Sequence, residues 1–205
     1  PAFVKENKLP LLSLPASPGF AGLLDASEPL QAALATEHEA FAGLRAEYEI
    51  VRRAWADAGI QGLFLKAVGL PPAFPHTSDN LDVYVRPEQG AAAREHLRRL
   101  GFVELRNIEE PNKYLFKRFR AGAEVCAVHL HLRLEWSVSF LHEAQVWARR
   151  RVAQDDARLL ISSPEDGLLI TLAHALYENK RLKLGDVVRV NHCLAAGQAV
   201  ERRQT

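Results

Sequence analysis

Strict alternation of apolar and polar residues in two stretches constrains the fold most, because it is the pattern of strands that bury one face. Successive side chains of a strand point to opposite faces, so residues of equal parity share a face. In the stretch 80–85, one face is formed by Leu81, Val83 and Val85, and the other by Asn80, Asp82 and Tyr84. The sequence therefore predicts a sheet in which at least one strand has a polar row.

The stretch 126–135 alternates in the same way. Its apolar residues are Cys126, Val128, Leu130, Leu132 and Leu134, and its polar residues are His129, His131, Arg133 and Glu135. If the two strands are neighbours and their polar rows coincide, Asp82 meets His129 or His131. We therefore predict one sheet in which Asp82 and His129 share a face.

A polar row of this kind does not by itself indicate a functional site. Antiparallel sheets commonly expose one face to water, and a solvated face produces the same alternation. Asp79 and Asn80 are also ordinary turn residues. On this interpretation Asp82 is exposed, and its replacement by asparagine changes the free energy of unfolding by less than about 0.5 kcal/mol.

Helical and strand patterns follow one another in the order of an α+β protein. Proline recurs too often in residues 1–27 for a helix, so an extended N-terminal arm is expected. The expected elements after the arm are a helix over 28–58, strands over 62–68 and 81–85, a helix over 87–100, strands over 101–106, 113–119 and 124–136, and then helices to the end. The predicted units are the arm 1–27, an α/β core 28–137 and a C-terminal helical region 138–205.

Residues that commonly end or begin helices support this division. Gly59 and Gly101 each follow a helical stretch, where a glycine often forms the C-terminal cap. Pro87 suits the first turn of the helix that Gly101 ends. In the C-terminal region, Ser163 and Asp166 have the spacing of a capping box.

Composition limits the classes of function. Of the 205 residues, 48% are apolar, and 26 basic side chains nearly balance 25 acidic ones, for a net charge of +1. Such a balance attracts neither nucleic acid nor a membrane surface, so we expect neither as a partner. Apolar runs stay far below the roughly 20 residues of a membrane span, and two cysteines do not form a disulfide framework. These observations predict a cytoplasmic, reduced protein.

The order and spacing of five short motifs resemble the nucleotidyltransferase superfamily with the polymerase-beta-like fold. The similarity is greatest to its branch of uncharacterised bacterial nucleotidyltransferases, and it extends over about residues 40–195. The matching segments are Leu65-Lys66-Ala67, the stretch 78–85, Leu100-Gly101-Phe102, the stretch 128–134, and Ser163-Pro164-Glu165-Asp166 with His174. This resemblance implies a nucleotidyltransferase-like mixed sheet with flanking helices and a C-terminal helical extension.

The resemblance also implies a reaction: Mg²⁺-dependent transfer of a nucleoside monophosphate from an NTP to a hydroxyl of a small-molecule or protein acceptor. In this superfamily, carboxylates on neighbouring strands bind two metal ions, which clamp the attacking and leaving oxygens. On this basis Asp82 and Asp79 are the candidate metal-binding and catalytic residues. The candidate nucleotide-binding residues are Lys66, Asn80, His129 and His131.

The sequence departs from the superfamily pattern at three positions. Asn80 stands where the first aspartate belongs, His129 where the third carboxylate belongs, and Ala67 where a glycine would let a phosphate approach the backbone. An amide is a poor ligand for Mg²⁺, and imidazole prefers softer metals. Asp79 lies one residue early and would need a bulge to turn it toward the site.

Three hypotheses about function therefore stay open. The first is a nucleotidyltransferase, with either full or impaired catalysis. The second is a catalytically degenerate nucleotidyltransferase fold that binds a nucleotide, a peptide or a protein partner. The third is a hydrolase or transferase that holds a transition metal on Asp82, His129 and His131, since carboxylate and imidazole are common ligands of such metals.

Overall fold

A mixed sheet organises the part of the chain that the computed structural model describes, which is residues 6–7, 11–13, 22, 27–65, 80–105, 110–135, 139, 141–153 and 156–204. Within these residues the sheet has seven strands in the order β3-β4-β5-β2-β1-β7-β6. The strands are β1 (Gly62–Phe64), β2 (Asn80–Val85), β3 (Val103–Leu105), β4 (Lys113–Arg120), β5 (Ala123–His131), β6 (Arg151–Ala153) and β7 (Asp156–Ile161). The helices are η1 (Leu11–Ser13), α3 (Glu28–Asp57), α4 (Pro87–Arg99), α5 (Glu143–Ala148), α6 (Pro164–Ala173), the π-helical turn η2 (His174–Glu178) and α7 (Leu184–Gln204).

Two parallel pairs and four antiparallel pairs make the sheet mixed, as predicted. β2 lies parallel to β5, with Asp82 opposite His129 and Tyr84 opposite His131. β4 and β5 form a hairpin that turns at Ala121 and Gly122, both with positive φ. Because β2 and β5 are direct neighbours, the two polar rows predicted from the sequence lie side by side.

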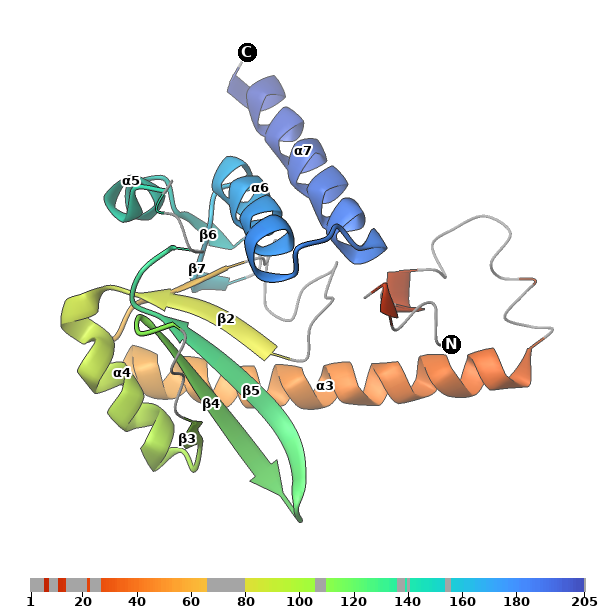
Figure 1. Cartoon of the computed structure of the whole chain (residues 1–205), viewed down its shortest axis with the longest axis horizontal. Coiled ribbons are helices and arrows are strands. Elements are labelled where there is room, and N and C mark those ends of the chain that lie inside the picture. The colour runs from red at the N-terminus through yellow and green to blue at the C-terminus, as the bar shows by residue number, and fades with distance from the viewer. Residues whose placement is uncertain are drawn as a thin grey trace.

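One face of the sheet is covered by α3 and α4, and α4 lies beside the left-hand end of α3 in Figure 1. Apolar residues on one side of α3 pack against the sheet because they recur at helical spacing: Leu44, Tyr48, Val51 and Trp55. The predicted helix ends are confirmed, since α4 begins at Pro87, and Gly59 and Gly101 have φ of 68° and 85°. The main core therefore lies between these two helices and the apolar sides of β2, β4 and β5.

The opposite face lies under α5, α6 and α7 (Figure 1). A second apolar cluster forms there, from Leu63, Leu65, Tyr84, Leu134, Leu141, Val146, Ile170 and Ala173. The prediction that the apolar residues of 126–135 all share one face is wrong for Leu134. β5 stops at His131, and Leu134 belongs to this second cluster instead of the first. The chain leaves the sheet after His131, so alternation no longer assigns faces beyond it.

The prediction that residues after 136 are helical to the end is wrong for 151–153 and 156–161. These residues form β6 and β7, and β7 runs parallel to β1. A strand at this place supplies hydrogen-bond partners for the side of β1 that faces away from β2. This need for hydrogen-bond partners follows from the position of β1 in the sheet, so it cannot be recognised in the local sequence of 151–161.

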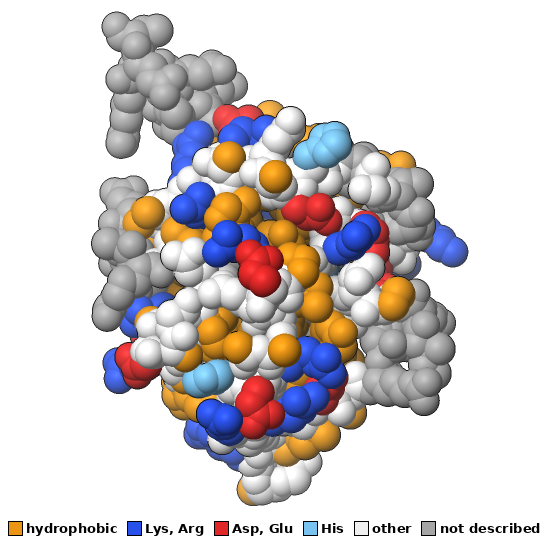
Figure 2. All heavy atoms as spheres, turned by 90° about the vertical axis from the view of Figure 1, so that its left-hand side faces the viewer, with side chains coloured by type: hydrophobic (Ala, Val, Ile, Leu, Met, Phe, Trp, Pro, Cys, Tyr) orange, Lys and Arg blue, Asp and Glu red, His pale blue; other side chains and the backbone are white. Residues whose placement is uncertain are grey.

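Exposed charges of both signs are interspersed on the face of the molecule shown in Figure 2. Charged side chains are also paired on and beside α4. Arg94 and Arg98 both contact Glu104, at 2.7 Å for Arg94, and Arg99 contacts Glu95 at 3.1 Å. Of the helices in the described part of the chain, none is both long and apolar enough to cross a membrane.

The predicted N-terminal cap of α6 at Ser163 is confirmed. The backbone N–H of Asp166 donates to the Ser163 hydroxyl at 3.1 Å, and that hydroxyl donates to the Asp166 carboxylate at 3.0 Å. Replacing Ser163 with alanine should therefore lower the free energy of unfolding by about 1 kcal/mol. Urea denaturation measures the change. Ser163→Thr, which keeps the hydroxyl, should lose much less, and equal losses in the two variants would contradict a capping role.

Candidate functional site

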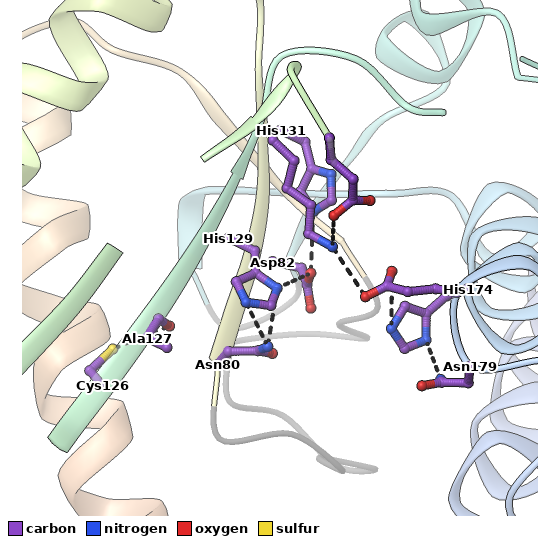
Figure 3. Close-up of polar contacts among 11 residues, drawn as sticks. Asn80, Asp82, Cys126, Ala127, His129, His131, His174 and Asn179 are labelled. Carbon is purple, nitrogen blue, oxygen red and sulfur yellow. Dashed lines mark hydrogen bonds and ion pairs between the residues drawn. The ribbon is translucent and has the colours of Figure 1, made fainter. Parts of the chain in front are cut away.

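Asp82 lies at the centre of the polar row. Its Oδ1 atom is 3.4 Å from Nδ1 of His129 and 3.3 Å from Nε2 of His131 (Figure 3). The Asp82 side chain is only 5% exposed. The prediction that Asp82 and His129 share a face of one sheet is confirmed. The interpretation of this face as solvated is wrong for Asp82 and His131, because helices cover it.

The outer end of the row is formed by Asn80 and His129. The Asn80 amide nitrogen lies 3.2 Å from Nδ1 and 3.3 Å from Nε2 of the His129 ring, so the amide can donate to the ring nitrogen that has no proton. The His129 side chain is 20% exposed, whereas that of His131 is 3% exposed. The row thus runs from a partly open end at Asn80 to a buried end at His131.

A second polar group extends the row across β4. Lys113, which lies opposite His131 in the hairpin, contacts Glu178 at 3.1 Å and Glu110 at 3.0 Å. Burial lowers the pKa of the Lys113 ammonium, but the two carboxylates outweigh this effect and leave the pKa above its usual value. The ammonium is therefore charged at neutral pH, and its ion pairs persist until the pH rises through that increased pKa.

The π-helical turn η2 connects this group to His174. Glu178 approaches Nε2 of His174 at 3.5 Å, and the Asn179 amide lies 3.1 Å from Nδ1 (Figure 3). The Asn179 amide nitrogen lies within hydrogen-bond distance of Nδ1, and the Glu178 carboxylate lies on the Nε2 side of the ring. His174 is therefore a hydrogen-bonded, largely buried histidine.

Arg189 on α7 supplies a buried cation on the same side of the sheet. Its side chain is 5% exposed and lies 4.0 Å from Asp186, one turn earlier in the helix. Burial lowers the pKa of the guanidinium, while the charges of Asp186 and Asp82 raise it. A guanidinium keeps its proton at neutral pH even when buried, so Arg189 places a full positive charge within electrostatic range of Asp82.

The structure brings four of the six candidate site residues together: Asn80, Asp82, His129 and His131. Lys66 and Asp79 lie outside the described residues, so their predicted roles stay predictions.

Sequence reasoning missed Lys113, Glu178 and Arg189 as members of this group. A signal for Arg189 was present, since a single arginine between Val188 and Val190 interrupts an apolar helical run. Lys113 and Glu178 had no such signal, because charged residues at the ends of elements are usually solvated.

The described side chains do not match the requirements of a two-metal Mg²⁺ site. Magnesium prefers several carboxylate oxygens together with water and phosphate. Here one carboxylate, Asp82, already contacts two imidazoles and lies in the field of Arg189. Among the residues described, no group of three or more His, Cys, Asp or Glu side chains is arranged to hold a metal ion. The described donors therefore do not fit Mg²⁺.

Comparisons with known proteins give one match to a family. Residues 18–201 match the family model described as uncharacterised nucleotidyltransferase. No curated protein matches the sequence. Among solved structures, the solution structure of the antibiotic-resistance factor ANT(2'')-Ia is similar, with 11% identity, a TM-score of 0.48, and coverage of 80% of this chain and 98% of that chain. A likeness this distant does not establish a shared ligand or reaction.

Proposed function

Because the chain belongs to the uncharacterised nucleotidyltransferase family, we propose that it is a nucleotidyltransferase-fold domain that binds a nucleotide but in which Mg²⁺-dependent transfer is impaired. The observation that supports this proposal most directly is the environment of Asp82. The resemblance implies that this carboxylate binds metal, yet its Oδ1 atom contacts His129 and His131. The Asp82 carboxylate thus already has partners within the protein.

The physical argument is one of charge. A two-metal mechanism requires carboxylates that offset the dehydration of Mg²⁺ and hold both ions in line with the reacting phosphorus. Asn80 and His129 replace two of these carboxylates, which removes about two negative charges from the site. Weak metal binding follows, and with it a slow transfer step, because positioning and charge neutralisation supply most of the rate of phosphoryl transfer.

The proposed nucleotide would approach the row from its open end. His129 is the more exposed of the two histidines, and Asn80 beside it offers an amide for hydrogen bonding. We keep Lys66 as the proposed contact to the triphosphate. In this proposal Asn80 and His129 contact the nucleotide directly, while His131 is a positioning residue that holds Asp82.

Family membership also favours a second candidate function. It is slow but genuine transfer of a nucleoside monophosphate to a hydroxyl of a small-molecule or protein acceptor, with Mg²⁺ as cofactor. This function would need Asp79 as a second metal ligand beside Asp82.

Two measurements on the unmodified protein separate these candidates. The first is transfer of label from α-labelled NTPs in the presence of Mg²⁺. The second is nucleotide binding by calorimetry, with Mg²⁺ or with EDTA. The proposal expects nucleotide binding that is unaffected by EDTA, together with very slow or undetectable transfer. Rapid transfer would establish the second candidate, and absence of nucleotide binding under both conditions would indicate a peptide or protein ligand instead.

Restoring carboxylates should restore metal binding. In the double variant Asn80→Asp, His129→Asp we expect Mg²⁺ to bind roughly tenfold more tightly or better, which corresponds to about 1.4 kcal/mol. Calorimetric titration with MgCl₂ measures the change. A matched control is His142→Asp with Asn191→Asp, since both positions are exposed and receive the same two charge changes. Equal affinity in the variant and the control would show that Asn80 and His129 do not occupy the positions of the lost acids.

A further inference from the structure

The face of the sheet that carries the polar row continues beyond the row onto β4 and β3. On β4, Phe116 packs in the main core, so the side chain of Leu115 points to the opposite face. On β3, Glu104 contacts two arginines of α4 on the core side, so Val103 and Leu105 also point to the opposite face. We call Val103, Leu105 and Leu115 the apolar platform.

The register of the strands places the apolar platform in line with the polar row. Residues that pair across neighbouring strands point to the same face, and successive pairs form lines that cross the sheet. One line consists of Leu105, Leu115, His129 and Asp82. The next line consists of Val103, Lys117, Ala127 and Asn80. Because neighbouring strands lie about 4.8 Å apart, Leu115 is about 5 Å from the His129 position and Leu105 is roughly 10 Å from it.

Exposure increases from the row toward the platform. On β4, the Lys113 side chain is 9% exposed where it contacts Glu178 of η2, and Leu115 is partly buried. On β3, Val103 and Leu105 are 51% and 36% exposed. In Figure 1, α5, α6 and α7 lie in the upper part of the view, whereas β3 and the turn between β4 and β5 lie in the lower part. The platform is therefore an open apolar surface that begins at the open end of the row, and adjoining exposed apolar side chains of this kind mark binding surfaces.

We propose that the apolar platform holds the base of the nucleotide, which packs flat on Leu115 and Leu105 while its sugar and phosphates extend toward His129 and Asn80. The inference rests on the proposed function, which it deepens by naming the surface that recognises the nucleoside. A base has two apolar faces, and burying one of them against aliphatic side chains removes apolar surface of both partners from water.

The chemistry of the two surfaces sets the orientation of the nucleotide. Sugar hydroxyls and phosphates require hydrogen-bond partners, which the Asn80 amide and the His129 imidazole offer and aliphatic side chains do not. Lys117 borders the platform on the side of the β4–β5 turn, and its ammonium is paired with Glu124 at 2.7 Å. Its charge is therefore balanced and does not attract phosphates onto the platform. A base over Leu115 and Leu105 leaves the attached ribose next to His129.

The first test removes apolar surface from the platform. The probes are ATP, GTP, CTP and UTP, each titrated separately by calorimetry in the presence of EDTA. For the triphosphate that binds most tightly, we expect the double variant Leu105→Ser, Leu115→Ser to bind roughly tenfold more weakly than the unmodified protein. The matched control is Val152→Ser with Leu194→Ser, because these apolar residues are 53% and 48% exposed but lie on β6 and α7. The control should bind as tightly as the unmodified protein.

The second test adds a stacking surface to the platform. In Leu105→Trp we expect the same triphosphate to bind roughly threefold more tightly, because a base stacks well on an indole ring. The fluorescence of the indole at position 105 should decrease when the nucleotide binds. Inorganic tripolyphosphate should leave this fluorescence unchanged, since it has no base.

Two outcomes would overturn the proposal. One is equal affinity of the double variant and the control, and the other is unchanged fluorescence of Leu105→Trp when the nucleotide is bound. If circular dichroism shows that the double variant is unfolded, Leu105→Trp decides alone, since position 105 is exposed. If the unmodified protein binds none of the four triphosphates, the proposed function fails and the inference fails with it. Binding by the unmodified protein that no platform variant alters rejects the inference alone.

Discussion

Replacing Asp82 with asparagine should lower the free energy of unfolding by about 2–4 kcal/mol, because breaking a buried charged network by removing one partner leaves the other uncompensated. The Asp82 side chain is 5% exposed, and its Oδ1 atom contacts both histidines of the row. The asparagine can still accept a hydrogen bond, so the cost is smaller than that of an apolar replacement. The buried Arg189 nevertheless loses one of the anions that act on it.

Denaturation by urea, followed by circular dichroism, measures this change. Glu88→Gln is a suitable control, because it also removes one negative charge but its side chain is 62% exposed. The control should change the free energy of unfolding by less than about 0.5 kcal/mol. An equally small change for Asp82→Asn would mean that water reaches this carboxylate, as the sequence alone had suggested.

Replacing Phe116 with alanine should have the largest effect of all, a loss of about 3–5 kcal/mol. Phe116 lies on β4 with 0% of its surface exposed, in the core between the sheet and α3. The truncation removes the free energy of burying a ring and leaves a cavity that neighbouring side chains fill only in part. Phe116 also pairs with Val128 on β5, one residue before His129, so the cavity would loosen the strand that holds both histidines.

The matched control is Phe119→Ala on the same strand, three residues later. Phe119 is 47% exposed, so its truncation should cost well under half as much as that of Phe116. The midpoint of urea denaturation and its slope should be compared for both variants, since an unchanged slope shows that the change lies in stability. Equal losses in the two variants would mean that the side of β4 that faces α3 is not closely packed.

The sequence was sufficient to predict the elements in which local patterns and packing agree. Helices α3 and α4 have apolar residues at helical spacing and clear end signals at Gly59, Pro87 and Gly101. Alternation in β2 and β5 predicted that Asp82 and His129 share a face, and their register confirms it. The resemblance to nucleotidyltransferases, which depended on motif order, is confirmed by the family match over residues 18–201.

Other features depended on contacts between residues far apart in the chain. Strands β6 and β7 are short, and β7 is a strand because β1 is beside it. Leu134 left the predicted face because the chain turns away from the sheet after His131. In both cases the local sequence was compatible with more than one structure. The free energy of packing and hydrogen bonding in the whole sheet determined which structure forms.

The candidate site also combines features that the sequence determined with features that depend on the tertiary structure. The sequence determined which residues form the polar row, because the parity of a strand fixes the face on which Asn80, Asp82, His129 and His131 project. It could not determine whether the row is solvated or covered, since that depends on where α6, η2 and α7 pack. Only the tertiary structure decided that Asp82 is buried and that Arg189, 107 positions after it in the sequence, acts on it. Electrostatic compensation depends on distance in space and on exclusion of water, and neither can be read from spacing along the chain.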